Sequence, residues 1–225
     1  MKIVITGKTG NLSKELQKIA EVEALDSQNY DITDPKIGIK IHKLNPDLII
    51  HAAALTDSNI VNKNLSKAIT TNIIGTANIA NYCIQKKKRL VYISTDYVFD
   101  GNVGNYKETD PVLPYNNYAW TKLGGECSVQ LVPNHLIIRT SFGPDEFPYK
   151  EAWNNQRVSK DYVDIIAPMI LKAAKSNMVG ILNIGTEPKT LYEYASKRNK
   201  VESIQKEQNK NFTLNTEKYE QSFLH

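Results

Sequence analysis

Cysteine and arginine are scarce in this sequence, and it has no long apolar run. The two cysteines, Cys83 and Cys127, form no CxxC pair and no Cys/His cluster, so no metal site is expected. Both lie in helical patterns and are predicted to be small buried residues. No run approaches the roughly 18 apolar residues that span a bilayer. The N-terminal run ends in a glycine turn, which is typical of a strand and not of a signal peptide. These absences predict a cytoplasmic protein that does not contact a membrane.

The shortage of arginine also argues against a nucleic-acid partner. The net charge is only +4, and lysine supplies most of the positive charge. Nucleic-acid readout usually relies on arginine forks and a clustered basic face. The basic run 86–89 and the lysines after Lys197 are interpreted as a solvated helix end and a polar tail. Hydrophobic residues make up 41% of the 225 residues, which is enough for a packed core.

Strand-like and helix-like patterns alternate through the first two thirds of the chain. Repeated strand-helix-strand order with short links predicts an α/β fold with a doubly wound parallel sheet of the Rossmann type. Residues 1–142 are expected to form the dinucleotide-binding core, and 143–225 a small substrate-binding cap and tail interleaved with it. The stretch 200–225 is expected to be irregular. Strands are expected at 2–6, 22–25, 47–51, 90–94, 135–140 and 179–184, and helices at 11–20, 35–44, 65–85, 115–131, 163–174 and 191–198.

A glycine-rich turn joins the first strand to the first helix. Gly7 permits the tight turn, and Gly10 lets the backbone approach a phosphate. The helix N-terminus that follows presents free N–H groups and a partial positive charge to a pyrophosphate. The third position of the pattern is Ser13 instead of glycine, and an ordinary strand-helix turn is the alternative. The turn residues expected to hold the cofactor are Gly7, Thr9, Gly10, Asn11 and Leu12.

The choice between NADH and NADPH stays open from the sequence. Asp26 follows the second strand, where an acidic residue commonly binds the adenosine ribose of NAD. Lys8 favours NADP instead, since it could neutralise a ribose 2′-phosphate. Asp31 and Ile32 are candidates for the adenine end. The small side chains of Ala52, Ala53 and Ala54 would let a flat cofactor lie against the backbone, and the preceding His51 is interpreted as a core histidine rather than a catalytic one.

Tyr118 and Lys122 are four residues apart, so they share one face of a helix. A phenol with a pKa near 10 is a poor acid-base group at neutral pH, and a neighbouring ammonium is expected to lower that pKa. The pattern YxxxK alone is common. Its position downstream of the glycine turn, and some two dozen residues after the strand end at Ser94 and Thr95, makes the combination far more specific.

With these motifs, the sequence resembles the extended short-chain dehydrogenase/reductases, and among them the dTDP-4-dehydrorhamnose reductase family. The resemblance rests on Gly7–Asn11, on 94–99 (STDYVF), on 118–126 (YAWTKLGGE) and on 138–141 (IRTS), and continues more weakly towards 217. It implies a catalytic triad of Thr95, Tyr118 and Lys122 that reduces the C4 carbonyl of a nucleotide-linked 4-keto-6-deoxysugar with NADPH or NADH. Tyr118 and Lys122 are also expected to bind the cofactor, with the lysine holding the nicotinamide ribose. It also implies a nucleotide-sugar as substrate and a homodimer as a possible assembly.

Three residues are assigned to the substrate on the same resemblance: Asp96, Tyr97 and Phe142. A sugar-nucleotide dehydratase needs an Asp-Glu pair after the catalytic threonine, and the pair Asp96-Tyr97 therefore favours reduction over dehydration. The chain is shorter than the family's usual length after Phe142, and Phe142 stands where the family usually has tryptophan. It could stack on substrate or belong to the core. Arg139 could bind a phosphate or pair with a carboxylate, and 157–165 is given a structural role.

Two other functions remain open from the sequence. A nucleotide-sugar 4-epimerase uses the same triad with a cofactor that stays bound. A non-catalytic, cofactor-binding regulatory subunit would suit a shortened cap, but the intact pair of Tyr118 and Lys122 argues against it.

Overall fold

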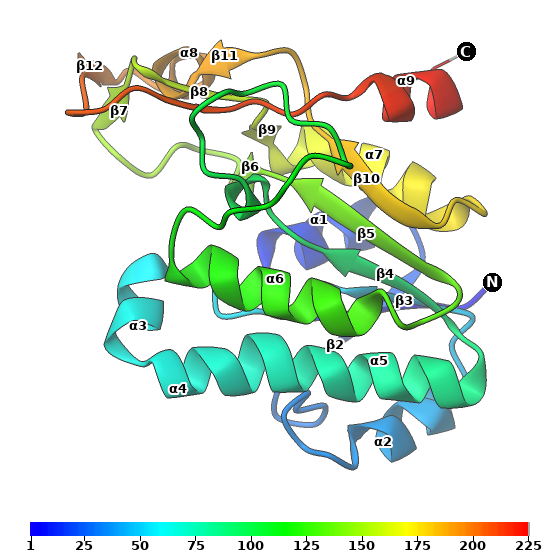
Figure 1. Ribbon diagram of the computed structural model, residues 1–225. Helices are drawn as coiled ribbons and strands as arrows, with labels where there is room; N and C mark the ends of the chain where they lie inside the picture. The colour runs from blue at the N-terminus through cyan, green and yellow to red at the C-terminus, as the bar shows by residue number, and fades with distance from the viewer. Residues whose placement is uncertain (225) are drawn as a thin grey trace.

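A six-stranded parallel sheet forms the centre of the computed structural model, which describes residues 1–224 (Figure 1). The strand order is β10-β5-β4-β3-β1-β2, which is that of a doubly wound sheet whose order reverses between β1 and β3. The predicted fold class is confirmed. The strands are β1 (Ile3–Thr6), β2 (Val22–Leu25), β3 (Leu48–His51), β4 (Arg89–Ile93), β5 (His135–Thr140) and β10 (Gly180–Ile184).

Helices cover both faces of the sheet, because its central strands are apolar on both sides. One core cluster joins the sheet to α1 and α7, and a second joins it to α2, α5 and α6. Among residues 1–224, no helix has the length and apolar character needed to cross a bilayer. The covering helices are α1 (Asn11–Ile19), α2 (Ile37–Leu44), α3 (Ser58–Lys63), α4 (Leu65–Ala68), α5 (Gly75–Lys86), α6 (Asn117–Val129) and α7 (Val163–Lys175).

The long helix expected at 65–85 is interrupted by a π-helical turn, η1 (Ile69–Ile74), between α4 and α5. The wider turn accompanies a polar side chain that points inward. Asn72 is fully buried, and its amide oxygen accepts from the Leu55 N–H at 2.7 Å. Its amide nitrogen donates to the Leu55 carbonyl and to Thr121 Oγ1 on α6. Periodicity alone could not detect this single-turn change of register.

Residues 143–224 contribute both to the cap and to the core. Short strands build the cap beside the carboxyl ends of the sheet strands, while α7 and β10 complete the central layers (Figure 1). The cap elements are β6 (Phe142–Gly143) with β9 (Asp161–Tyr162), β7 (Glu151–Trp153) with β12 (Glu202–Ile204), β8 (Gln156–Val158) between β11 (Lys189–Thr190) and β13 (Lys210–Phe212), and α8 (Leu191–Ser196).

Two sequence expectations about the fold are wrong. The stretch after residue 200 is not irregular, because it forms β12, β13 and α9 (Glu217–Phe223). Tyr219 of α9 is buried in the core cluster that also holds α1 and α7, so apolar contacts fix this helix on the sheet. Cys127 is exposed on α6, whereas Cys83 is buried on α5 as expected. The structure places Cys127 on the side of α6 that faces away from the sheet.

Candidate active site

The glycine turn and the end of β3 lie side by side where the strand order reverses. Thr6 pairs with His51 in the register of β1 and β3, so Gly7 and Ala52–Ala54 leave the sheet together. Gly7 has a φ of +86°, and a Cβ there would lie 3.0 Å from the Cα of Ala53. Only glycine fits this position without strain. A ligand crevice is expected at such a switch point in a doubly wound sheet.

His51, the last residue of β3, is buried beneath this crevice. The ring is fully buried between two threonines: Nδ1 lies 2.7 Å from Thr6 Oγ1 and Nε2 lies 3.0 Å from Thr76 Oγ1. Thr76 donates its own proton to the carbonyl of Asn72, so Nε2 must carry the imidazole proton. Burial, with a smaller contribution from Lys122, lowers the pKa of His51 to about 3. The neutral ring therefore has the structural role that was expected.

Two adjoining cavities, of about 560 and 990 Å³, open along this crevice. Gly7, Thr9, Ala53 and Ala54 line both of them. Every residue predicted to bind cofactor or substrate, or to act in catalysis, lines at least one cavity. The smaller cavity adds Gly10, Asn11, Leu12, Ala52, Thr95, Asp96, Tyr97, Tyr118, Lys122 and Phe142, and the larger adds Asp26, Asp31 and Ile32.

The N-terminus of α1 faces the smaller cavity and has the properties of an anion site. It has no side-chain cap, and its first turn holds no acidic residue. The hydroxyl of Ser13 is buried there without a hydrogen-bond partner in residues 1–224. Free backbone N–H groups, the helix dipole and an unused hydroxyl fit a phosphate. The free hydroxyl of Ser13 is a feature that the sequence did not reveal.

The larger cavity holds the groups that bear on cofactor choice. Asp26 accepts hydrogen bonds from the backbone N–H and side-chain amide of Asn29. These bonds lower the pKa of Asp26, and the nearby Lys8 contributes in the same direction. Asp31 likewise caps its own turn through Thr33. Because Asp26 and Lys8 line one cavity, the structure leaves both forms of the cofactor open.

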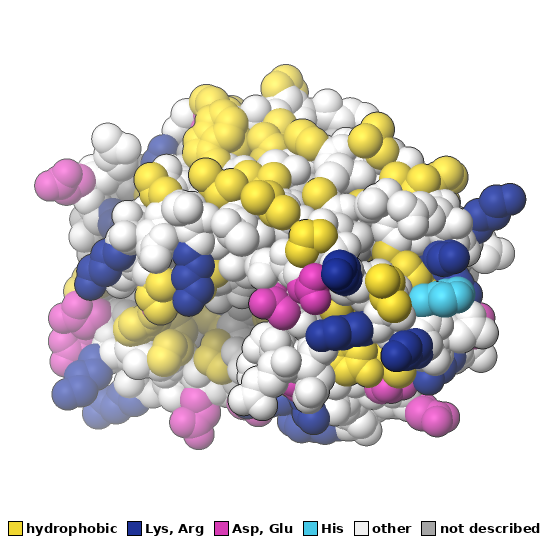
Figure 2. Space-filling view, turned by 90° about the horizontal axis from the view of Figure 1, so that it is seen from below, with side chains coloured by type: hydrophobic (Ala, Val, Ile, Leu, Met, Phe, Trp, Pro, Cys, Tyr) yellow, Lys and Arg dark blue, Asp and Glu magenta, His cyan; other side chains and the backbone are white. Residues whose placement is uncertain are grey.

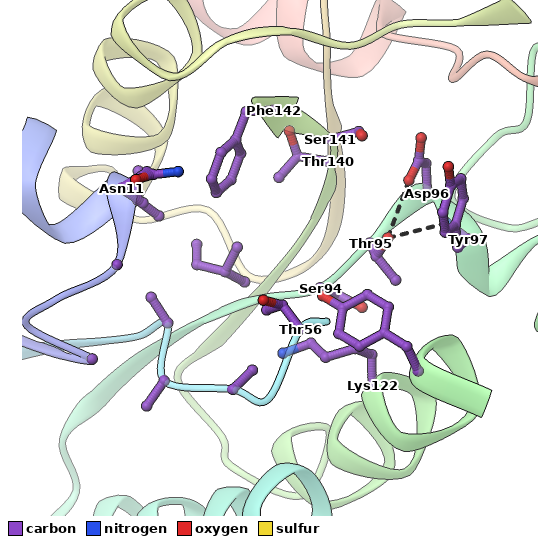
Figure 3. A pocket seen from close by; sticks show the side chains of 18 of the residues that line it. Asn11, Thr56, Ser94, Thr95, Asp96, Tyr97, Lys122, Thr140, Ser141 and Phe142 are labelled. Atoms are coloured by element: carbon purple, nitrogen blue, oxygen red, sulfur yellow. Dashed lines mark hydrogen bonds between the residues drawn. The ribbon is translucent and has the colours of Figure 1, made fainter. Parts of the chain in front are cut away.

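Thr95 lies at the carboxyl end of β4 and caps the short 3-10 helix η2 (Asp96–Val98). Its hydroxyl accepts from the N–H of Tyr97 at 3.2 Å and donates to Asp96 Oδ1 at 3.1 Å (Figure 3). Asp96 is almost fully buried, and its Oδ2 has no partner in residues 1–224. Burial raises the pKa of Asp96 to about 6, and Lys160 opposes that shift. A buried acceptor without a partner points to a ligand that would supply a donor.

Tyr118 and Lys122 project from α6 towards the same space. Gly125 lets α6 approach the sheet, since a Cβ there would lie 2.3 Å from the Tyr92 hydroxyl. The Lys122 Nζ lies 4.1 Å from the centroid of the Tyr92 ring, and the side chain is 2% exposed. Burial lowers the pKa of Lys122 to about 7, and Glu126 opposes that shift. Figure 3 shows the amine extending into the cavity near Ser94 and Thr56.

The expected effect of Lys122 on the phenol is wrong for the protein without a bound cofactor. Burial raises the pKa of Tyr118, and the Asp96 carboxylate raises it further. The dominant cause is removal of the phenol from water, which disfavours its charged form. The phenol is therefore protonated at neutral pH, which is the state a proton donor requires.

A buried ion pair beneath the site holds α6 against the sheet. Arg139 Nη2 lies 2.9 Å from Glu126 Oε2, and both side chains are at most 4% exposed. Ser94 Oγ also donates to Glu126, at 2.5 Å. Of the two roles open for Arg139, carboxylate pairing is the one observed. Glu126 lies within the YAWTKLGGE segment, but nothing in the sequence indicated that it connects to Ser94 and Arg139.

Phe142 combines the two roles that the sequence left open. It lines the smaller cavity, and its ring also packs against the core cluster of α1 and α7. Thr140 and Lys160 line the same cavity, although the sequence did not single them out. The Thr140 hydroxyl is buried without a partner in the described part of the chain. Within residues 1–224, no group of three His, Cys, Asp or Glu residues is arranged to hold a metal ion.

Comparison with known proteins places the chain in a family. The family described as RmlD substrate binding domain matches residues 1–146. A dTDP-4-dehydrorhamnose reductase of Mycobacterium tuberculosis is 36% identical over 152 residues, covering 63% of this chain and 50% of the relative. The reductase of Aggregatibacter actinomycetemcomitans is 33% identical over 180 residues, covering 75% and 61%. The chain thus spans about half to three fifths of the length of these relatives.

Solved structures agree over nearly the whole chain. A dTDP-4-dehydrorhamnose reductase of Bacillus anthracis in complex with NADP superposes with a TM-score of 0.88 at 26% identity, covering 99% of this chain and 92% of that one. A hypothetical dTDP-4-dehydrorhamnose reductase of Sulfolobus tokodaii gives a TM-score of 0.87 at 28% identity, covering 98% and 94%. Since the family match extends over more than half of the sequence and includes the glycine turn, Thr95, Tyr118 and Lys122, the chain belongs to the RmlD substrate binding domain family.

Proposed function

We propose that this protein reduces the C4 carbonyl of a nucleotide-linked 4-keto-6-deoxysugar with NADPH or NADH. The observation that carries the proposal is the convergence of Thr95, Tyr118 and Lys122 on the cavity that the glycine turn also lines. The names of the curated relatives support the same substrate class.

The residues present fit a dinucleotide. The open N-terminus of α1 and the unpartnered Ser13 hydroxyl would hold the pyrophosphate. Ala52–Ala54 would lie against the flat ring systems, and Lys122 would hold the nicotinamide ribose. Asp26, Asp31 and Ile32 would line the adenosine end. A structure neighbour binds NADP, which supports a cofactor of this class.

The bound cofactor would supply the hydride, and the chain's own side chains handle the charge that results. Tyr118 donates its phenolic proton to the oxygen that gains negative charge, and its raised pKa keeps that proton in place until then. Thr95 releases Asp96 and donates to the same oxygen. In its protonated form, Lys122 stabilises the tyrosinate that remains beside it.

One feature separates this function from dehydration. Tyr97 occupies the position where a dehydratase needs a second carboxylate, and its ring packs between Tyr115 and Phe212. No carboxylate is therefore available there for the elimination of water. A 4-epimerase remains the second candidate, because it uses the same three side chains, and a regulatory subunit that only binds cofactor is the third.

The test is consumption of NADPH and NADH with a 4-keto-6-deoxy nucleotide-sugar, by wild type and by Tyr118→Phe. The variant should lose at least about a hundredfold in rate, as expected for one acid-base catalyst, while it still binds cofactor. Conversion of the sugar without net oxidation of cofactor would identify an epimerase instead. Tight cofactor binding with no consumption by wild type would support the regulatory function.

We also infer that two copies of the chain associate through the helices on one face of the sheet. Large apolar side chains on these helices are 46–52% exposed: Ile60, Leu65, Ile69, Ile74 and Trp120. In Figure 2, which views the molecule from below, hydrophobic side chains gather in the upper part of the picture. A cluster of Lys and Arg lies apart from them, lower and to the right. Analytical ultracentrifugation of wild type and Trp120→Glu tests this homodimer, and a wild type that remains monomeric at high concentration contradicts it.

A further inference from the structure

Lys160 enters the substrate end of the cavity from a tightly fixed backbone. It lies between β8 and β9, next to Ser159. The Ser159 carbonyl accepts from the N–H of Thr186 at 2.9 Å, and the Ser159 hydroxyl accepts from the N–H of Leu214 at 3.1 Å. The Lys160 carbonyl accepts from Lys189 Nζ at 3.2 Å. Because three separate segments hold this link, the position of the Lys160 side chain is set by the fold.

Lys160 and Asp96 face the same cavity with opposite charge and do not pair with each other. Neither takes part in an ion pair within 4.0 Å among residues 1–224. The Lys160 Nζ lies 5.5 Å from the centroid of the Tyr194 ring, and Asp96 Oδ2 has no hydrogen-bond partner in the described part of the chain. The two groups still interact through space, since each shifts the pKa of the other towards its charged form. Both side chains line the smaller cavity, so a ligand in it meets a buried acceptor and a donor together.

The group that fits between them must donate to a carboxylate and accept from an ammonium. A hydroxyl does both, whereas a carbonyl cannot donate and a methyl group can do neither. A phosphate or carboxylate would be repelled by Asp96. Asp96 Oδ1 accepts from the Thr95 hydroxyl, which turns to the reacting oxygen when the substrate binds, so Asp96 lies beside that oxygen. The hydroxyl held by Oδ2 should therefore lie on a carbon next to the carbonyl that is reduced.

We propose that Lys160 and Asp96 clamp the C3 hydroxyl of the substrate, so that the enzyme selects sugars with a free hydroxyl beside the C4 carbonyl. This proposal rests on the proposed function and adds to it a specificity-determining residue, Lys160. A hydrogen bond to a charged group typically contributes about 1.5–3 kcal/mol, so removal of the hydroxyl should lower kcat/KM about 10- to 100-fold.

The test compares a 4-keto-6-deoxy nucleotide-sugar with its 3-deoxy analogue in wild type and in three variants. Wild type should prefer the 3-hydroxy compound by about 10- to 100-fold in kcat/KM. Lys160→Met keeps the length of the apolar stem and should reduce that preference to less than about threefold. Lys160→Arg should retain most of it. Lys150→Met, an exposed lysine of the same segment, should behave as wild type. Cofactor affinity and thermal unfolding of each variant report whether the fold is intact.

The outcomes separate this proposal from the proposed function. Oxidation of cofactor by wild type with equal kcat/KM for both sugars would overturn the clamp and leave the reductase function standing. The same holds if Lys160→Met keeps the full preference. If wild type oxidises no cofactor but binds a 4-hydroxy nucleotide-sugar more tightly than its 3-deoxy form, with dependence on Lys160, the reductase function fails and the clamp stands.

Discussion

Replacing Glu126 by glutamine removes one charge from the buried pair that holds α6 against the sheet. The partner, Arg139, then remains buried with its full charge, since both side chains are at most 4% exposed. Breaking a buried pair in this way costs about 3–5 kcal/mol. In a domain of this size, 1 kcal/mol corresponds to about 2–4 °C, so the melting temperature should fall by roughly 6 to 20 °C. Urea unfolding followed by circular dichroism measures the change in the free energy of unfolding.

An exposed ion pair with nearly the same nitrogen–oxygen distance provides the control. Lys2 Nζ lies 3.0 Å from Glu23 Oε2, but these side chains are 45% and 42% exposed. Glu23→Gln should therefore cost less than about 1 kcal/mol. Adding Arg139→Met to Glu126→Gln should recover part of the loss, because the unpaired buried charge is gone. A loss below about 1 kcal/mol for Glu126→Gln, or equal losses at both sites, would refute the reasoning.

Two further predictions concern charge in the cavities. Burial lowers the pKa of Lys122 to about 7 from 10.5, so between these values the unfolded chain binds more protons than the folded one. The free energy of unfolding of the cofactor-free protein, relative to that of Lys122→Met, should therefore rise from pH 7 to pH 9 by up to about 1.4 kcal/mol per pH unit. Urea unfolding measures both proteins, and a difference between them that stays constant or falls over this range rejects the prediction. Lys8→Met should weaken NADPH binding about fivefold and leave NADH binding unchanged. Isothermal titration with both cofactors tests it, and equal losses would show that Lys8 does not face the 2′-phosphate.

The cofactor end of the site could be predicted from the sequence because its signals are local. Gly7 and Gly10 are close together in the chain, and the buried runs of β1 and β3 show where each strand ends. Tyr118 and Lys122 share a helix face through their spacing alone. The topological rule for parallel sheets then brings the strand ends together at one edge. Little long-range information is needed for this half of the site.

The substrate end depends on contacts between distant segments. Lys160 reaches the cavity only because β9 pairs with β6 and because Thr186 and Leu214 fix the backbone beside it. Asn72 lies in a π-helical turn that has no hydrophobic period of its own. The polar composition after residue 200 concealed two strands and a helix, since few apolar residues, such as Phe212 and Tyr219, anchor them.

The contacts of β13 have a consequence for the order of events during synthesis. Asn211 N–H donates to the Gly101 carbonyl at 2.7 Å, and Leu214 pairs with Tyr106 and joins its small apolar cluster. The ring centroids of Phe212 and Tyr97 lie 4.7 Å apart. The loop after Thr95 therefore lacks its apolar partners until residues 210–214 have left the ribosome. A nascent chain can complete the first strands and the glycine turn early, but its substrate pocket must wait, and until then the loop is open to chaperones and proteases.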